Sequence, residues 1–154
     1  MDKKILKIEL VPDGCWYSNL RAVLSAKEWN YIKAKAKERA GGKCAICGKK
    51  TNYLDAHEQW SYDEKKGVQK LIGIIAVCKD CHSVIHIGRT SLVGNIEKAE
   101  NHYLKVNGAT YAEYRAALKK ANEEHRRRNE VSEWSLDISY LKDYLDEGDT
   151  SGNH

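Results

Sequence analysis

The sequence predicts an α+β fold, and three observations lead to this prediction. Two strand-like stretches, residues 53–62 and 68–77, are joined by a polar link that ends in Gly67, as expected of a hairpin. One Cys-x-x-Cys pair precedes the first stretch and another follows the second. Segments with helical periodicity and capping residues lie on either side. A chain of 154 residues suits one domain, which we expect to span residues 1–145.

The N-terminal part, residues 4–41, is expected to hold a short strand and a basic helix. Residues 4–11 alternate apolar and polar side chains, as strands do, and a turn-forming stretch follows at Pro12. Ser25-x-x-Glu28 is a capping box that begins a helix, and Gly41-Gly42 ends it. The outer face of this helix bears five cations, Lys27, Lys33, Lys35, Lys37 and Arg39.

The predicted core, residues 44–89, ends in a Cys-x-x-Cys knuckle and a short helix over residues 78–88. The C-terminal part, residues 91–145, contains a helix over 92–106 and another that begins at the capping box Thr110-x-x-Glu113. A strand at 134–138 and a last helical turn at 141–145 follow. We expect the first and last strands to form a small terminal strand pair, and the acidic tail 146–154 to be disordered.

Charge is distributed unevenly along the chain. The formal net charge is +4, but residues 1–50 contain twelve Lys and Arg against five Asp and Glu. A basic region of this kind suits a polyanionic partner. No apolar run approaches the roughly 20 residues that span a bilayer, and the charged start does not resemble a signal peptide. We therefore expect a cytoplasmic protein with no membrane partner.

Two Cys-x-x-Cys pairs predict a structural zinc site. Each pair holds two sulfurs close together, and two pairs complete a tetrahedral set of thiolates. The four ligands are Cys44, Cys47, Cys78 and Cys81. In a reducing cytoplasm such cysteines are metal thiolates rather than disulfides. The fifth cysteine, Cys15, is interpreted as a small buried hydrophobic residue.

A second metal position is indicated by His82 and His86. Residues four apart on a helix project from the same face, so both imidazoles can approach one ion. A third partner is expected upstream, in the segment Asp55-Ala56-His57-Glu58. His102 and His125 are interpreted as surface residues.

Residues 44–89 resemble an HNH endonuclease core of the zinc-containing kind, in which two Cys-x-x-Cys pairs surround a ββα hairpin. Most of the chain resembles a group of bacterial and phage proteins of similar length that are generally labelled HNH endonucleases. The matching segments are Cys15-Trp16-Tyr17-Ser18-Asn19-Leu20-Arg21, His57-Glu58-x-Trp60-x-Tyr62-Asp63, Leu71-Ile72-Gly73, Cys81-His82 to Gly88, Val106-Asn107-Gly108 and Trp134-x-Leu136-Asp137.

The resemblance implies a ββα-metal fold and hydrolysis of phosphodiester bonds in DNA or RNA. It implies that His57 is the general base and that His82 and His86 bind a catalytic cation such as Mg²⁺, Mn²⁺ or Ni²⁺. Glu58 is a further candidate catalytic residue. The nucleic acid would be bound by Lys33, Lys35, Lys37, Arg39 and Arg89.

Two positions depart from the family pattern. Ala56 stands where the family has a metal ligand, and Gly73 stands where it has the asparagine that partners the base. Asp55 or Glu58 could replace the missing ligand if the strand were bulged, because neighbours on a strand face opposite ways. Alternatively, His57 completes a three-histidine site, with Glu58 or Asp63 as base or supporting partner.

These departures leave more than one function open. The first is a metal-dependent endonuclease. The second is a zinc-containing nucleic-acid-binding or adaptor protein that has lost the cation site. The third is a protein-binding or ligand-binding factor, such as a phage counter-defence protein.

Overall fold

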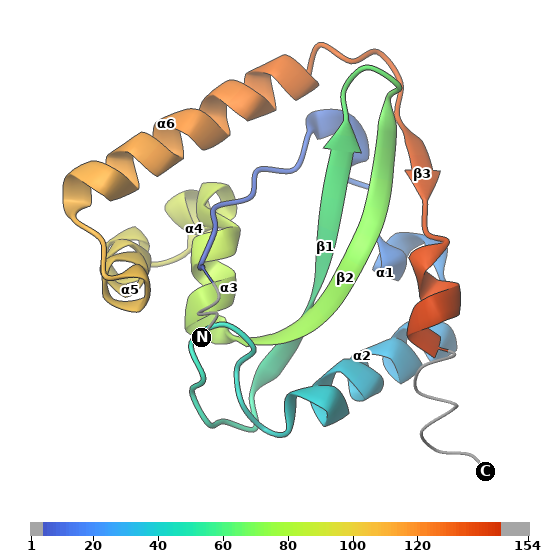
Figure 1. Ribbon diagram of the computed structural model, residues 1–154, viewed down its shortest axis with the longest axis horizontal. Coiled ribbons are helices and arrows are strands. Elements are labelled where there is room, and N and C mark those ends of the chain that lie inside the picture. The colour runs from blue at the N-terminus through green and yellow to red at the C-terminus, as the bar shows by residue number, and fades with distance from the viewer. Residues whose placement is uncertain (1–4, 146–154) are drawn as a thin grey trace.

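The computed structural model describes residues 5–145, and it is an α+β structure with a small three-stranded sheet surrounded by helices (Figure 1). A 3₁₀ turn at Asp13–Cys15 and a one-turn helix, α1, precede the long basic helix α2. The hairpin β1–β2 leads directly into α3 and α4, and α5, α6, β3 and a helical segment at residues 140–145 complete the chain. The bounds are α1 Leu20–Val23, α2 Ala26–Ala40, β1 Leu54–Asp63, β2 Val68–Cys78, α3 Lys79–Ile85, α4 Ile87–Val93, α5 Ile96–Asn107, α6 Tyr111–Arg128 and β3 Ser135–Asp137.

The sheet has the order β1-β2-β3. β1 and β2 pair antiparallel from Leu54 opposite Cys78 to Asp63 opposite Val68, with an irregularity between Gln59 and Trp60. β3 adds to the other edge of β2 in parallel. This parallel pairing requires a long crossover, which α3 to α6 provide.

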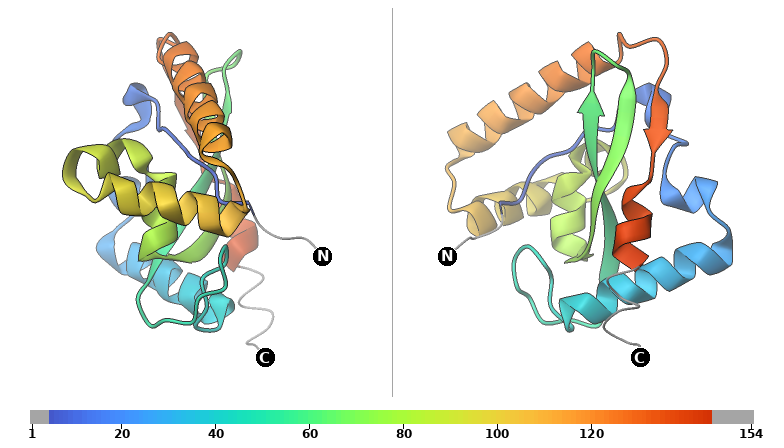
Figure 2. Two further views of the ribbon diagram at one scale, coloured as in Figure 1. Left: turned by 90° about the vertical axis from the view of Figure 1, so that its left-hand side faces the viewer. Right: turned by 45° about the vertical axis from the view of Figure 1, so that its right-hand side comes forward.

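Helices pack against the hairpin from different sides (Figure 2). α2 contacts both long strands, and α3, which follows β2 immediately, contacts them as well. α5 packs on α3 and α4, while α6 continues from α5 toward the hairpin tip (Figure 1). Most of the buried apolar residues in the described chain belong to one cluster, with Leu6, Leu20, Ile32, Val84, Tyr114 and Tyr144 among its members.

Both predicted capping boxes are confirmed. In α2 the Ser25 hydroxyl accepts the Glu28 N–H, and the Glu28 carboxylate accepts the Ser25 N–H. Thr110 and Glu113 make the same pair of bonds at the start of α6. Each box satisfies two amide groups that a helix start leaves without intrahelical partners, which is why the sequence marks these starts well.

The strand predicted at residues 4–11 is wrong for the described residues 5–11, which form no strand. Their backbone groups bond elsewhere: the Asn107 carboxamide accepts the Leu6 N–H and donates to the Leu6 carbonyl, both at 2.9 Å. The Glu9 N–H donates to the Ile85 carbonyl. The expected terminal strand pair is therefore also wrong, because the last strand, β3, joins β2 instead.

The helix predicted over 92–106 begins later, at Ile96. Leu92 and Val93 belong to α4 and are largely exposed. The apolar residue Leu92 therefore does not mark the buried face of the predicted helix. Helix α4 ends before Gly94, and the Asn95 side chain caps the start of α5. The predicted disordered tail, 146–154, lies outside the described residues. Among residues 5–145, no helix combines the length and apolar character that crossing a bilayer requires.

Candidate metal centres

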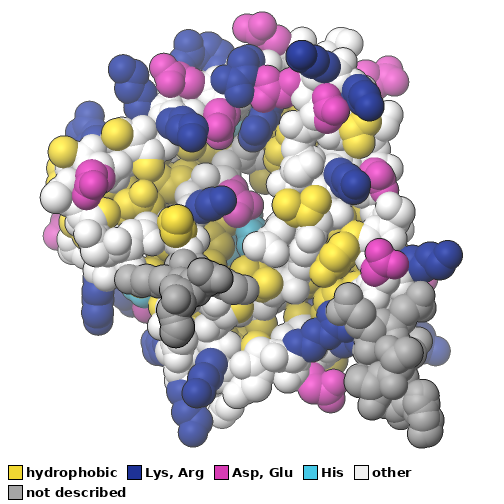
Figure 3. Space-filling model, viewed as in Figure 1, with side chains coloured by type: hydrophobic (Ala, Val, Ile, Leu, Met, Phe, Trp, Pro, Cys, Tyr) yellow, Lys and Arg dark blue, Asp and Glu magenta, His cyan; other side chains and the backbone are white. Residues whose placement is uncertain are grey.

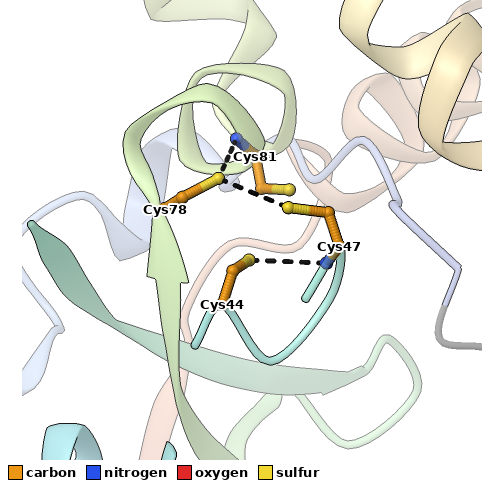
Figure 4. A group of neighbouring side chains, drawn as sticks. All are labelled: Cys44, Cys47, Cys78 and Cys81. Atoms are coloured by element: carbon orange, nitrogen blue, oxygen red, sulfur yellow. Dashed lines mark hydrogen bonds between the residues drawn. The ribbon is translucent and has the colours of Figure 1, made fainter. Parts of the chain in front are cut away.

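The four predicted cysteines lie together (Figure 4). Cys44 and Cys47 occupy the turn after α2, Cys78 ends β2, and Cys81 lies in the first turn of α3. Their sulfurs all lie within 4.8 Å of one another, and those of Cys47 and Cys78 are 3.7 Å apart. The sulfurs of Cys44 and Cys78 also accept backbone N–H groups from their own knuckles, at 3.4–3.5 Å. This four-cysteine cluster is compatible with tetrahedral zinc.

Hydrogen bonding and burial shift the pKa values of three of these thiols, Cys44, Cys78 and Cys81. The hydrogen bond from Cys81 lowers the pKa of Cys44 to about 4. Burial raises the pKa of Cys78 to about 11, and the bond that Cys81 donates to Cys44, together with burial, raises the pKa of Cys81. Four thiolates cannot share this small volume without a compensating charge, and a divalent cation supplies that charge.

His102 was expected on the surface, and instead it contacts the four-cysteine cluster. Its Nε2 lies 3.2 Å from the Cys81 sulfur, and the side chain is only partly exposed on α5. Burial is the main cause of a lowered His102 pKa. No local sequence pattern marks this contact, because 21 residues separate the two partners.

A second cluster consists of three histidines. His57 comes from β1, His82 from α3, and His86 from the junction of α3 and α4. One nitrogen from each lies within 4.8 Å of the others. The ring centroids are separated by 4.7 Å for His82 and His86, and by 5.5–5.6 Å from His57 to each of them. The structure thus brings together the three histidines that the sequence singled out.

Two members of this three-histidine cluster, His82 and His86, favour the neutral imidazole. Burial, aided by the neighbouring His82 and His57, lowers the pKa of His86 to about 3. Burial and the proximity of His57 also lower the pKa of His82. His57 itself is 4% exposed. Neutral imidazoles have free lone pairs, which metal ligation requires.

Two carboxylates contact these histidines. Asp55 Oδ2 lies 3.2 Å from His82 Nδ1, and the other oxygen of Asp55 accepts a hydrogen bond from Lys79 at 3.0 Å. The Glu9 carboxylate, from the N-terminal segment, lies 3.3–3.4 Å from His57 Nε2. The sequence analysis included Asp55 in the upstream segment expected to supply a partner, and the contact with His82 is made without a bulge next to Asp55. The sequence contained no indication of Glu9, which is 48 residues from His57.

Glu58 lies apart from the three-histidine cluster. The pairing of residues 54–59 is regular, so Ala56 and Glu58 face away from His57. Glu58 Oε1 accepts the backbone N–H of Leu20 at 2.9 Å, and burial raises the pKa of its carboxyl group. Ala56 packs against the apolar core. Asp63 is also elsewhere, since its side chain caps the hairpin turn.

The space beside Gly73 is occupied by the flexible side chain of Gln59. Gly73 pairs with Gln59 across the hairpin, and a Cβ at this position would collide with the Gln59 carboxamide. The space that an asparagine at 73 would need is therefore filled by a neighbouring strand residue.

A broad, open groove of about 2220 Å³ runs past the three histidines. Seven basic residues line it, Lys7, Arg21, Lys33, Lys37, Arg89, Lys120 and Arg128. Four acidic residues line it as well, and Glu9 and Asp55 are among them. Figure 3 shows histidine atoms within a recess near the middle of one face. Arg89 is close enough to His86 to contribute to its lowered pKa.

Lys35 and Arg39, the other two residues of α2 that were predicted to bind nucleic acid, make contacts away from this groove. The Arg39 guanidinium stacks 4.0 Å from the Tyr144 ring and donates to the Tyr144 carbonyl at 2.7 Å. The Lys35 ammonium lies over the Tyr31 ring. Arg39 thus attaches the C-terminal helical segment to α2, and only Lys33 and Lys37 of the predicted set on this helix line the groove.

Comparison with known proteins adds no assignment. No family model, no curated protein and no solved structure matches this chain. The resemblance to HNH endonucleases therefore depends on the residues and their arrangement alone.

Proposed function

We propose that the chain is an HNH-type, metal-dependent endonuclease that hydrolyses phosphodiester bonds in DNA. A structural zinc would bind the four cysteines, and a second divalent cation would bind at His82 and His86, with His57 facing it. The three-histidine cluster in a groove lined by cations is the observation that supports this proposal most strongly.

The order of the elements supports the same assignment. His57 lies on the first strand of a hairpin, and His82 and His86 lie on and just after the helix that follows the second strand. One Cys-x-x-Cys pair precedes the first strand, and the other lies at the junction of the second strand and the helix. This is the arrangement that the sequence resemblance implies for a zinc-containing HNH core.

The donor set indicates which cation the site prefers. The cluster offers imidazole nitrogens, and the two nearby carboxylates are engaged with histidines rather than included in it. Imidazole favours ions such as Mn²⁺, Co²⁺, Ni²⁺ or Zn²⁺ over Mg²⁺. When bound, such an ion would supply Lewis acidity that offsets the negative charge developing on the phosphate.

The protein residues have three tasks in this proposal. His82 and His86 bind the cation through lone pairs that their lowered pKa values keep free. His57 accepts the proton of the attacking water at a ring nitrogen. Arg89, Lys33 and Lys37 contact the phosphates of the DNA on either side of the cleaved bond, at positions that line the groove.

Plasmid nicking by purified protein tests the proposal. With Mn²⁺, Co²⁺ or Ni²⁺, we expect His57→Ala to reduce the rate by roughly 10²–10⁴-fold, which is the usual size of a general-base contribution. His82→Ala should abolish the dependence on added cation while zinc is retained. His125→Ala is the matched control, because His125 pairs with Asp13 outside the three-histidine cluster. Equal nicking by all three variants and the wild type would contradict the proposal.

A second candidate is a zinc-containing nucleic-acid-binding or adaptor protein without catalysis. Two observations favour it: Ala56 packs into the core, and the space beside Gly73 is occupied by Gln59. Both positions therefore lack the side chains of a complete HNH site. Salt-sensitive DNA binding with no cleavage under any of the three cations would select this function.

A further inference from the structure

Glu9 approaches the three-histidine cluster from outside the hairpin and helix that supply the histidines. Its backbone N–H donates to the Ile85 carbonyl at 2.9 Å, which anchors this part of the N-terminal segment to α3. Its two carboxylate oxygens lie 3.3 and 3.4 Å from His57 Nε2. The His57 side chain is 4% exposed, so this contact lies at the edge of a buried imidazole. The segment 5–11 is therefore part of the candidate site.

The contact constrains where the His57 ring carries its proton. A neutral imidazole has one N–H donor and one lone pair, and a carboxylate can only accept. A lone pair on Nε2 would face the negative charge of Glu9, so the N–H belongs on Nε2. The lone pair is then on Nδ1, which becomes the nitrogen that can take a proton or bind a metal.

We propose that Glu9 is a positioning residue that fixes His57 in its Nε2–H form and so keeps Nδ1 available for the reaction. This inference rests on the proposed function and deepens it, because it supplies the partner that the base loses at Gly73. The partner comes from a segment some 48 positions before the histidine rather than from the hairpin.

Asp55 and His82 make a similar pair with the opposite nitrogen. Asp55 contacts His82 Nδ1, which leaves Nε2 of that ring as the lone-pair nitrogen. Lys79 partly neutralises Asp55 at 3.0 Å. Two of the three histidines are thus oriented by carboxylates, an arrangement that is typical of imidazoles whose second nitrogen has a chemical task.

Long-range ¹H–¹⁵N NMR on zinc-loaded protein without added cation shows which ring nitrogen of His57 carries the proton. We expect the Nε2–H form in the wild type, and loss of this preference in Glu9→Ala. Asp13→Ala is the matched control, since Asp13 pairs with His125 Nε2 at 3.4 Å in the same N-terminal part of the chain. An Nδ1–H form in the wild type, or an unchanged His57 spectrum in Glu9→Ala, would overturn the proposal.

Kinetics provide a second readout. Glu9→Ala should lower kcat by about 10–100-fold, the usual effect of removing a partner of this kind, with little change in KM for DNA. Glu9→Gln retains an acceptor oxygen and should recover part of the loss, whereas Asp13→Ala should behave as wild type. An equal loss in Glu9→Gln and Glu9→Ala, with a lowered Tm in both, would reduce Glu9 to a structural role and overturn the proposal.

These readouts separate this inference from the proposed function. If the wild type cleaves no DNA, the endonuclease proposal fails, while the NMR result still decides whether Glu9 sets the protonation of His57. If the wild type cleaves DNA and Glu9→Ala changes neither the spectrum nor kcat, only the role of Glu9 fails.

Discussion

At the scale of single residues, the four-cysteine cluster depends on groups that neutralise or donate to its sulfurs. The knuckle amides donate to Cys44 and Cys78, and His102 contacts Cys81. Such donors spread the negative charge of thiolates and make them less reactive. Removing a sulfur and removing a donor should therefore have different consequences.

Cys47→Ser should leave little folded protein. Zinc bound by such sites contributes on the order of 10 kcal/mol of apparent binding free energy, which is also folding free energy. Far-UV circular dichroism and elemental zinc analysis of the purified variant measure this effect. Cys15→Ser is the control, because Cys15 is buried but lies outside the four-cysteine cluster. A Cys47→Ser protein that stays folded with one full equivalent of zinc would refute this zinc site.

His102→Ala should keep the fold and release zinc faster. Without an N–H donor next to Cys81, we expect about a 10-fold faster transfer of zinc to a chelator, at the lower end of the effects known for partners of metal ligands. A colorimetric zinc indicator follows the transfer. His102→Gln, which retains an N–H donor, should release zinc at a rate closer to wild type. Release rates that are the same in all three proteins would show that the contact has no influence on the metal.

Sequence predicted these residues only where the pattern is local. Each Cys-x-x-Cys pair and the His82/His86 pair consist of residues at most four positions apart, so their spacing could be recognised in the sequence. Glu9 and His102 reach their partners across 48 and 21 residues, and their own neighbours in the sequence are unremarkable. Contacts of this kind depend on packing, which no short spacing encodes.

At the scale of elements, α2 separates its cations onto two sides. Lys33 and Lys37 are four residues apart, one turn of helix, and both line the groove. Lys35 and Arg39, also four apart, interact with Tyr31 and Tyr144 instead. The sequence predicted the helix and its charge, but it did not show which cations the C-terminal segment would cover.

Lys33→Ala with Lys37→Ala should weaken duplex DNA binding and flatten its salt dependence. Each phosphate contact contributes about 0.9 to the slope of log K against log salt, so losing two contacts should reduce the slope by about 1.8. Fluorescence anisotropy at several salt concentrations gives this slope. The control is Lys27→Ala with Lys35→Ala, which removes the same charge from positions that do not line the groove. If the two double variants bind alike, α2 contributes only its net charge.

Strands show the same difference between local and distant information. The hairpin β1–β2 was predicted because its turn and both strands are contiguous in sequence. Residues 5–11 have the alternation of a strand, yet their backbone groups bond to the Asn107 side chain and the Ile85 carbonyl. Alternation predicts which side chains are buried, and here Leu6 is indeed buried, but a strand also needs a partner edge.

At the scale of the whole molecule, two asparagines, one at the end of α5 and one after α6, bind the N-terminal segment that supplies Glu9. Asn107, at the end of α5, fixes Leu6 through both backbone groups. Asn129, after α6, accepts the Asp13 N–H. The site is thus built from parts that are more than 40 residues apart. The end of α6 is joined to the hairpin turn by hydrogen bonds.

Glu64, at the tip of the hairpin, provides that attachment. Arg127 donates two hydrogen bonds to its carboxylate, at 2.6 and 2.9 Å, and Arg128 donates one at 3.1 Å. These bonds, Arg127 first, lower the pKa of Glu64 from about 4.5 to about 2. Because the folded-state pKa lies below the ordinary value, the carboxylate stabilises the fold above about pH 4.5, and this contribution is lost as the pH falls toward 2.

Glu64→Gln should therefore lower Tm at pH 7 by about 1–3 °C, as expected for a partly exposed ion pair in a chain of this size. The difference from wild type should stay constant between pH 8 and 5, since Glu64 is ionised in both folded and unfolded protein over that range. Differential scanning fluorimetry at several pH values measures it, in a window where the thiolates still hold zinc. Asp63→Asn is a useful comparison, because Asp63 caps the same turn without contacting α6. A Tm difference that shrinks between pH 8 and 6 would assign the effect to a histidine instead and contradict this role of Glu64.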